Sequence, residues 1–303
     1  MNKKAIATAP PPFTMVRRLG AALLLLLVTA IWGSAFVFTK NAIPVLGPFH
    51  FLFYRFLIAT ALMALIAVRR LKHIGRDMLI AGIITGAALA GGYASQTIGL
   101  QYTTVSNSAF ITGFYVVLTP FAGWFFSRVI QARHVALGLA ALFGLALFSL
   151  NEQFRLNAGD IWTLACAAIY ACHFVLLGRY SPDRDSLLLT LLQLVTATIF
   201  FGLTALLTEA PPQPAAFNNE VWFALVFCAV LASALAFFIQ TAAQKVLSPT
   251  QAALTLTTEA PFGAFFGWLL LAEKLLPRQF LGAAILICTM MMALLKTESS
   301  SKN

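Results

Sequence analysis

Residues 257–268 read TTEAPFGAFFGW, an apolar run that contains one acid, Glu259, two residues before Pro261. A similar run, TPFAGWFF, occupies residues 119–126 and places Pro120 at the position of Pro261. Runs of this kind are typical of helices that are buried or embedded in a membrane. A glutamate inside such a run is informative only if a membrane surrounds it, and the composition decides that question.

The chain is far more apolar than a soluble protein. Of its 303 residues, 60% are hydrophobic and 10% are charged, whereas soluble domains are about 45–50% apolar and about 25% charged. The net charge of +10 is spread over short clusters between apolar runs, which indicates membrane topology rather than a nucleic-acid partner. We therefore expect the lipid bilayer to be the main partner. The four cysteines form no CxxC pair, and we interpret them as small buried hydrophobes.

The first residues, MNKKAIATAPPPFTMVRRLGAALLLLLVTAIWG (1–33), resemble a signal peptide. However, the apolar run continues beyond residue 38 without an A-x-A site, and it is longer than the apolar region of a cleaved leader. We expect it to be the first membrane span, preceded by a cytosolic tail over residues 1–18.

Ten apolar segments approach the length of roughly 20 residues that a membrane-spanning helix needs. The gaps between them are short, and none is long enough to fold as a domain. The expected spans are 19–39, 48–68, 77–100, 104–127, 134–150, 158–178, 186–208, 219–244, 249–271 and 279–295.

The basic residues divide unequally between the two sides of these spans. Of the 20 Lys and Arg residues, fifteen fall on the side of the N-terminus, and Arg55 lies within a span. The other side holds Lys40, Arg155, Lys274 and Arg278. Because positive charge favours the cytoplasmic side, we predict that both termini are cytoplasmic.

The two halves of the chain resemble each other in three places. AIWGSAFV (30–37) matches AIYACHFV (168–175), Gln96-Thr97 matches Gln240-Thr241, and the two proline-containing runs match in the same order. Each half has five spans, an odd number, so the second copy must be inserted upside down. Inverted repeats are a feature of secondary transporters, whose site lies near the midplane between the halves.

The fold class predicted is an all-α membrane protein of ten transmembrane helices, arranged as two inverted five-helix repeats around a central cavity. We expect the first repeat over residues 19–150, the second over 151–296 and a cytosolic C-terminal tail over 297–303. The GxxxG pair of Gly82 and Gly86 favours close helix packing within the monomer over a homodimer.

Four segments carry a resemblance to a known family. They are WGSAFVFTK (32–40), FLFYRFLIATALM (51–63), QTIGLQYTTVSNSAFITGFYVVLTP (96–120) and EAPFGAFFGWLLLAEK (259–274). With them the chain resembles the ten-span EamA-type branch of the drug/metabolite transporter superfamily, essentially throughout after residue 19. The resemblance implies a compact ten-helix carrier in a bacterial inner membrane, of a kind that often exports metabolites or amino acids. It does not fix the substrate.

Polar residues recur at helical spacing on the first, third, fourth, sixth, eighth and ninth spans, whereas the fifth and tenth spans are nearly free of them. Because polar side chains in a membrane face the protein interior or a wet cavity, these stripes predict a substrate-binding cavity. For any single Ser or Thr, helix packing is the alternative. The substrate-binding residues predicted are Trp32, Tyr93, Gln96, Thr112, Tyr115, Tyr170, His173, Gln240 and Glu259.

Glu259 is the acid that lies deepest in any expected span. A charge at mid-membrane costs on the order of 2.5–3.5 kcal/mol on insertion scales, so it needs a partner, water or a proton. One hypothesis is a carboxylate that couples transport to a proton or contacts a substrate amine; the alternative is a structural ion pair. Arg55, His173 and Lys40 are the candidate partners, and we place Lys40 and Arg55 in a charge network. Arg55 has fold stabilisation as its alternative role, and Lys40 has the membrane interface.

Pro120 and Pro261 each remove one backbone donor from a helix, which frees the carbonyls of Val116 and Thr257. Freed carbonyls beside a cavity can bind a polar substrate or lie at a gating bend, and the alternative is a static kink.

Motifs of other function classes are missing from the sequence. It has no HExxH or GxSG motif and no Gly-Lys pair, so we expect no enzyme, no metal, no cofactor and no ATP-driven pump. The function predicted is a secondary transporter that exports small amphiphilic metabolites, such as amino acids, across the bacterial inner membrane by alternating access. A proton is the coupling ion considered. The alternative is a channel-like facilitator, or a carrier for other solutes such as drugs or nucleotide-linked metabolites.

Overall fold

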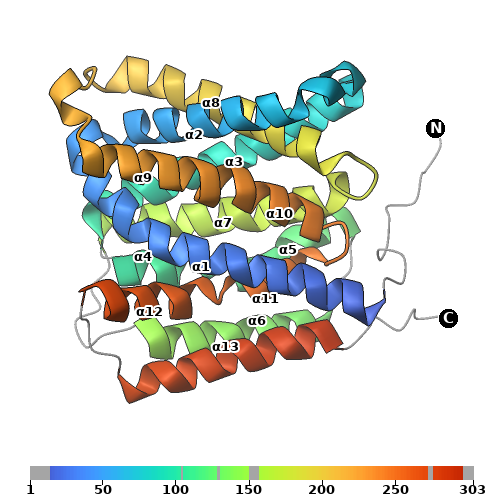
Figure 1. Ribbon diagram of the computed structural model, residues 1–303. Coiled ribbons are helices and arrows are strands. Elements are labelled where there is room, and N and C mark those ends of the chain that lie inside the picture. Colours follow the sequence, from blue (N-terminus) through green and yellow to red (C-terminus); the bar gives the residue numbers. More distant parts are fainter. Residues whose placement is uncertain (1–13, 104, 128–129, 150–156, 272–275, 296–303) are drawn as a thin grey trace.

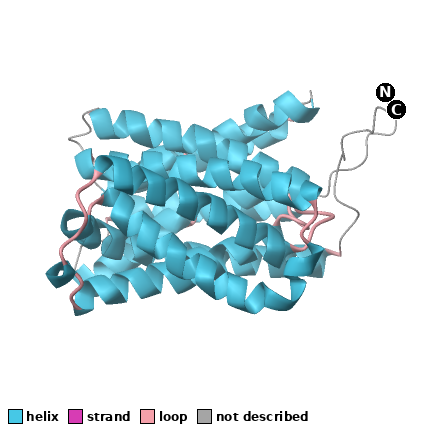
Figure 2. Cartoon of the chain, turned by 90° about the horizontal axis from the view of Figure 1, so that it is seen from above, coloured by secondary structure: helices cyan, strands magenta, loops and turns pink. Residues whose placement is uncertain are grey.

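The computed structural model describes residues 14–103, 105–127, 130–149, 157–271 and 276–295. These residues are almost entirely helical (Figures 1 and 2). Seven spans are uninterrupted α-helices: α1 (Met15–Leu46), α2 (Pro48–Ala67), α3 (Arg76–Tyr102), α6 (Ala132–Ser149), α7 (Ala158–Tyr180), α8 (Ser186–Thr208) and α13 (Pro277–Leu295). Two short 3-10 helices, η1 (Val68–His73) and η2 (Pro214–Ala216), lie in the connections.

The other three spans are interrupted. They are α4 (Val105–Thr112) with α5 (Tyr115–Ser127), α9 (Asn219–Ala229) with the π-helical segment η3 (Val230–Leu235) and α10 (Ala236–Ala243), and α11 (Pro249–Leu256) with α12 (Glu259–Leu271). With these three, the ten spans expected from the sequence are all present, and their bounds agree with the expected ones to within a few residues at most ends.

The helices run alongside one another, and the described loops gather at the two ends of the bundle (Figure 2). The first residues of α1 and the last residues of α13 lie at the same end (Figure 1), as an even number of crossings requires. We call it the terminal end, and the other the opposite end. Seven helical segments are long and apolar enough to cross a membrane. The prediction of an all-α membrane protein is confirmed.

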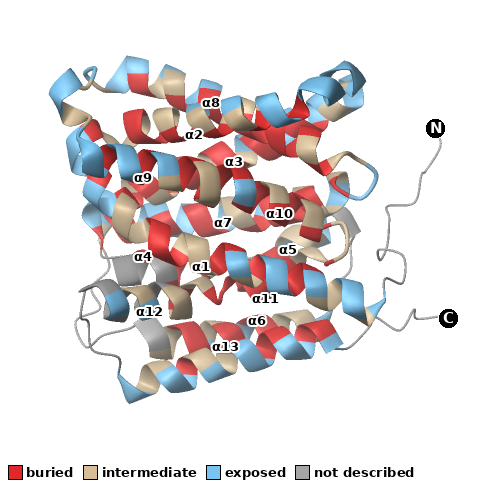
Figure 3. Cartoon of the chain, in the orientation of Figure 1, coloured by how far each residue is buried: buried red, intermediate tan, exposed pale blue. Residues whose placement is uncertain are grey.

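Large apolar side chains cover the outside of the bundle, while the buried residues gather in its centre (Figure 3). Leu206 on α8 is 78% exposed, and Phe280 on α13 is 64% exposed. In water such a surface would be unfavourable, whereas in lipid it is the expected one. Helices α6 and α13, the two spans that are nearly free of polar residues, pack against each other.

The fourth span breaks at Gly113 and Phe114, seven residues before the proline at which a kink was expected. Hydrogen bonds of the three-residue type, such as Val116 N–H to the Gly113 carbonyl at 3.1 Å, tighten the chain there. Pro120 lies inside α5. The carbonyl of Val116 faces α6, because a Cβ atom on Gly138 would lie 3.0 Å from its oxygen.

The ninth span, expected as one helix over 249–271, is two half-helices that meet just before Glu259. The hydroxyl of Thr257 donates to the Leu254 carbonyl at 2.7 Å, and that of Thr258 donates to the Thr255 carbonyl at 2.8 Å. Such bonds compete with the helical ladder. Pro261 cannot donate to the Thr257 carbonyl, which receives a long hydrogen bond of 3.4 Å from Ala260 N–H.

The two halves of the chain pack closely along α3. A Cβ atom on Gly82 would lie 2.2 Å from Cβ of Leu192, and one on Gly86 would lie 2.6 Å from Cβ of Thr196, both on α8. Real atoms do not approach so closely, so glycine is required at both positions for the contact with α8. The GxxxG pair therefore packs within the chain, as the sequence indicates.

Candidate functional site

The larger of the two described cavities lies between the two halves of the chain. It has a volume of about 710 Å³ and is lined by α1, α2, α3, α4, α5 and, from the second half, α7, α10 and α12. All nine residues predicted to bind substrate line it, and so does Arg55. Their common position is a structural fact, whereas their role in binding stays a prediction.

Sequence reasoning missed other parts of the wall. Phe174 and Phe237 supply aromatic surface, and Thr39 and Thr97 supply hydroxyl groups. The two phenylalanines gave no signal, because an apolar residue in a membrane helix faces lipid and protein equally well. Thr97 is adjacent to Gln96 and would have been found by widening the polar face of its helix.

Aromatic rings form a connected wall in the cavity. The rings of Tyr93 and Tyr170 are 6.1 Å apart and arranged edge to face, and Phe237 lies 5.8 Å from Tyr93 and 5.6 Å from Trp32. These spacings are within the favourable range for aromatic pairs. The wall is therefore a rigid apolar surface against which the apolar part of a ligand can pack.

Arg55 is held in the cavity wall by neutral groups. Its side chain donates from Nε to Ser233 Oγ at 2.8 Å, and from Nη2 to the Tyr93 hydroxyl at 3.1 Å and the Ala232 carbonyl at 3.2 Å. The guanidinium also lies 5.0 Å from the centre of the Tyr93 ring. The Ala232 carbonyl lies in the π-helical segment η3, and it also accepts a hydrogen bond from Trp32 Nε1 at 2.8 Å.

Glu259 begins the half-helix α12 and lines both the larger cavity and an adjoining one of about 260 Å³. No hydrogen bond or ion pair to its carboxylate occurs among the described residues. The positive end of the α12 dipole favours a negative charge at this position. The helix break therefore offsets part of the free-energy cost of a carboxylate at this depth of the membrane.

Two glutamines in the cavity wall differ in their hydrogen bonding. Gln96 Nε2 donates to Thr112 Oγ1 at 3.3 Å. The side-chain oxygen of Gln240 is buried and has no hydrogen-bond partner among the residues that the structure describes. A buried amide oxygen without a donor is costly, and a ligand donor in the cavity would satisfy it.

His173 reaches the cavity but is also part of a hydrogen-bonded network. Its Nε2 lies 3.0 Å from Gln193 Oε1, and Gln193 Nε2 donates to Thr241 Oγ1 at 3.2 Å. His173 therefore has a hydrogen-bond partner within the protein as well as a position in the cavity wall. Other residues of the polar stripes pack between helices: Gln244 donates to the Phe174 carbonyl, and Gln251 donates to the Ala293 carbonyl.

Lys40 and the two prolines lie apart from the cavity. Lys40 is exposed and joins no hydrogen bond or ion pair within the described ranges, which agrees with the interface alternative. Neither Pro120 nor Pro261 lines a described cavity. The gating role of the prolines stays a prediction.

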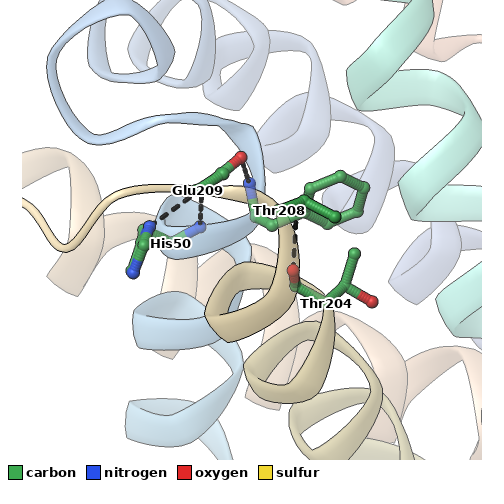
Figure 4. Close-up of polar contacts among 5 residues, drawn as sticks. His50, Thr204, Thr208 and Glu209 are labelled. Carbon is green, nitrogen blue, oxygen red and sulfur yellow. Dashed lines mark hydrogen bonds and ion pairs between the residues drawn. The ribbon is translucent and has the colours of Figure 1, made fainter.

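Two acids join the halves of the chain at the ends of the bundle. At the opposite end, Glu209, which follows α8, accepts hydrogen bonds at the N-terminus of α2 from Phe49 N–H at 2.8 Å and His50 N–H at 2.9 Å (Figure 4). It also pairs with His50 Nδ1 at 2.9 Å.

At the terminal end, Asp185 caps α8 and pairs with Arg70 at 2.7 Å. Partial burial of the Asp185 carboxylate opposes ionisation. The hydrogen bonds from Arg70 and from the backbone amides of Leu188 and Leu187 outweigh it and lower the pKa of Asp185.

Within the described ranges, no group of three or more His, Cys, Asp or Glu side chains lies close enough to hold a metal ion. What the site offers is a partly open cavity with an aromatic wall, a few hydrogen-bonding groups, one guanidinium and one carboxylate.

A ten-crossing helical bundle with such a cavity between two repeats defines a multi-pass membrane transporter. The comparisons with known proteins agree. The model of the EamA-like transporter family matches residues 19–150 and 157–295, so the chain belongs to the EamA-like transporter family, within the drug/metabolite transporter superfamily, and is a transporter rather than an enzyme.

Several relatives and a solved structure are similar over most of the chain. An uncharacterized transporter of Archaeoglobus fulgidus is 33% identical over 93% of this chain and 88% of its own length. An S-adenosylmethionine/S-adenosylhomocysteine transporter of Chlamydia trachomatis is 24% identical over 85% of this chain and 84% of its own. A solved structure described only as a crystal structure of a protein superposes with a TM-score of 0.74 at 15% identity, covering 91% of this chain and 98% of that one; it supports the fold alone.

Proposed function

We propose that this protein is a secondary transporter that exports small amphiphilic metabolites, such as amino acids, across the bacterial inner membrane by alternating access. The observation that carries the proposal is the cavity between the two halves, whose wall combines aromatic rings with hydrogen-bonding and charged groups. Such a lining suits a ligand with an apolar body and a few polar groups. Among the described lining residues Arg55 is the one Lys or Arg, which argues against phosphate-rich ligands.

Alternating access is supported by the arrangement of the helices around the cavity. The site lies between the halves, and two of the lining spans are split beside it, at Gly113 and at Thr257. Discontinuous helices at a midplane site recur in secondary transporters, in which one repeat rocks against the other. The distribution of Lys and Arg supports cytoplasmic termini.

One relative favours a second candidate substrate. The Chlamydia trachomatis protein is named as a transporter of S-adenosylmethionine and S-adenosylhomocysteine. Those solutes carry an adenine ring, for which the connected rings of Tyr93, Tyr170 and Phe237 offer a stacking surface. An adenosyl amino acid is therefore the alternative to a simple amino acid.

A thermal-shift screen followed by flux measurement tests the function. Purified protein is screened against the twenty amino acids, S-adenosylhomocysteine and S-adenosylmethionine, because ligand binding raises apparent stability. The stabilising solute is then loaded into proteoliposomes. We expect saturable flux with counterflow of the labelled solute. Flux that rises linearly with concentration and shows no counterflow would indicate a channel, and the absence of flux for every solute would refute transport.

Proton coupling through Glu259 belongs to the same proposal. It is supported by the position of the carboxylate in the wall of both cavities. Flux of the stabilising solute is measured across a range of pH for the wild-type protein and for Glu259→Gln. An unchanged pH dependence in the variant would remove the proton role while leaving transport intact.

A further inference from the structure

Two oppositely charged side chains in the cavity wall are each left without a charged partner. Arg55 is only 3% exposed and bonds through Nε and Nη2 to neutral groups, while its Nη1 has no hydrogen-bond partner among the described residues. The carboxylate of Glu259 likewise accepts no hydrogen bond from them. Burying a charge without a counter-charge is strongly unfavourable, so each group needs something that enters the cavity.

The two charges belong to different halves of the chain and lie at different depths. Helix α2 begins at the opposite end of the bundle with Pro48, and Arg55 follows seven residues later, about 10 Å along the helix from that end. Helix α12 ends at the opposite end of the bundle with Leu271, and Glu259 precedes it by twelve residues, about 18 Å along the helix from that end. They form no ion pair with each other, so the cavity wall is positive at one depth and negative at another.

The guanidinium of Arg55 is oriented so that one of its nitrogens can bind an anion. Its guanidinium is fixed by Ser233, Tyr93 and Ala232, so that Nη1 is the group left over to bind a ligand. A guanidinium fixed in this way loses little freedom when it binds a carboxylate. Glu259 is fixed in position by the start of α12.

We propose, on the basis of the transport function proposed above, that the substrate is a zwitterion whose carboxylate binds Nη1 of Arg55 and whose ammonium group binds the carboxylate of Glu259. A ligand with one charge pairs with one of these residues and leaves the other buried and unpaired, and a neutral ligand pairs with neither. A zwitterion closes both pairs and adds no net charge to the membrane interior. The aromatic wall then contacts the rest of the ligand.

Matched ligands test this assignment on the wild-type protein. Phenylalanine and leucine are each compared with the amide, which lacks the carboxylate, with the decarboxylated amine and with the acid that lacks the amino group. S-adenosylhomocysteine is compared with methylthioadenosine, which lacks both charged groups. Since hydrogen bonds to charged groups are stronger than those between neutral groups, each partial ligand is expected to bind at least about 10-fold more weakly than its zwitterion.

Two variants assign the charges to the residues. In Glu259→Gln the preference for the amino acid over its deaminated acid is expected to disappear, while the preference over the amide remains. In Arg55→Gln the reverse is expected. Glu220→Gln and Arg17→Gln change exposed residues and are the matched controls, which should keep both preferences. Where Arg55→Gln does not fold, the ligand series on the wild-type protein and on Glu259→Gln still decides the matter.

The outcomes separate this inference from the proposed function. Binding of the amide or the amine as tightly as the amino acid would overturn the inference. Counterflow of a solute with no zwitterionic group, with no amino acid or S-adenosylhomocysteine bound, would overturn it while leaving the transporter function standing. Absence of flux for every solute would refute the transporter function itself.

Discussion

Two acids at the ends of the bundle have charged or hydrogen-bonding partners, whereas the charged side chains in its centre lack a charged partner among the described residues. At the ends, Glu209 is bonded to the start of α2 and to His50, and Asp185 is paired with Arg70. In the centre, Arg55 and Glu259 line a cavity and form no ion pair with each other. Both end contacts join α2, or the turn that follows it, to α8. Charge at the ends therefore joins the two halves, whereas the two charges in the centre lack a charged partner among the described residues, as the ligand-binding role proposed for them requires.

The largest expected effect comes from the central cation. Arg55→Met removes three hydrogen bonds and leaves the groups around Ser233 without their donor. We expect a loss of stability of roughly 2–3 kcal/mol together with loss of transport. Thermal unfolding and proteoliposome flux measure the two effects. Arg55→Lys keeps the charge without the planar fork and is expected to fold better than Arg55→Met but to transport poorly. A fully active Arg55→Met protein would contradict the contrast between the two regions.

The contact at the opposite end should matter for stability more than for ligand binding. Glu209→Ala removes the acceptor for two backbone amides at the start of α2, and loss of such a cap costs about 1–2 kcal/mol. Thermal unfolding of the variant is compared with that of Glu220→Ala, which changes an exposed acid. Ligand affinity is expected to stay unchanged in both variants, and a selective loss of affinity in Glu209→Ala would show that the two regions are not separate.

Gly47 offers a sharper test of the same contact. Its φ is 82°, and a Cβ atom there would lie 2.7 Å from Oε2 of Glu209. Gly47→Ala would therefore strain the backbone and clash with Glu209, and it should lower the free energy of unfolding by about 1 kcal/mol or more. In the Glu209→Ala background the steric part of this cost disappears. A double-mutant cycle on unfolding free energies measures the coupling, and strictly additive costs would contradict the contact.

The smallest effect is expected at the terminal end, where Arg70 is 58% exposed. Exposed pairs contribute about 0–1 kcal/mol, and Asp185→Asn keeps a capping side chain while it removes the charge. The pKa of Asp185 is lower in the folded protein than in the unfolded chain. The contribution of Asp185 to the free energy of unfolding is therefore fully present above the unfolded pKa of about 3.9 and is lost as pH falls through the folded pKa. The difference in stability between wild type and variant should be constant from about pH 7 to pH 5 and shrink below about pH 4. A difference that grows towards acid pH would have the wrong sign.

Much of the fold was predictable because a lipid bilayer restricts which backbone structures can cross it and where polar side chains can lie. The need for apolar helices of sufficient length located the ten spans, and the positions of polar residues on them located the cavity. The breaks in the fourth and ninth spans were not predicted in place. The break in the fourth span lies at Gly113, and the break in the ninth span lies at the hydroxyl bonds of Thr257 and Thr258. The prolines, which are the visible signal in the sequence, lie beyond both breaks.

The site was predictable in part for the same reason. The side chains of Trp32, Gln240 and Glu259 line the cavity as expected. The bonding partners of Arg55 were not foreseen, because they come from a π-helical segment in the other half of the chain. Which polar residues line the cavity and which pack between helices, as Gln251 does, depends on the rotation of each helix. Helical spacing alone does not fix that rotation.

Covalent blocking of the cavity tests the central claim, that substrate passes through it, most directly. Thr97 lines the cavity, and Ile287 on α13 is 50% exposed on the outside. Cys172 and Cys288 are exposed, contrary to the burial expected from the sequence. Each of the two positions is changed to cysteine in a protein in which Cys172 and Cys288 are replaced by serine, and a small hydrophilic thiol reagent is applied during counterflow. We predict that the reagent stops flux in Thr97→Cys, that the transported solute slows the modification, and that Ile287→Cys and the parent protein keep their flux. Full flux in a Thr97→Cys protein that carries the modification would contradict the account.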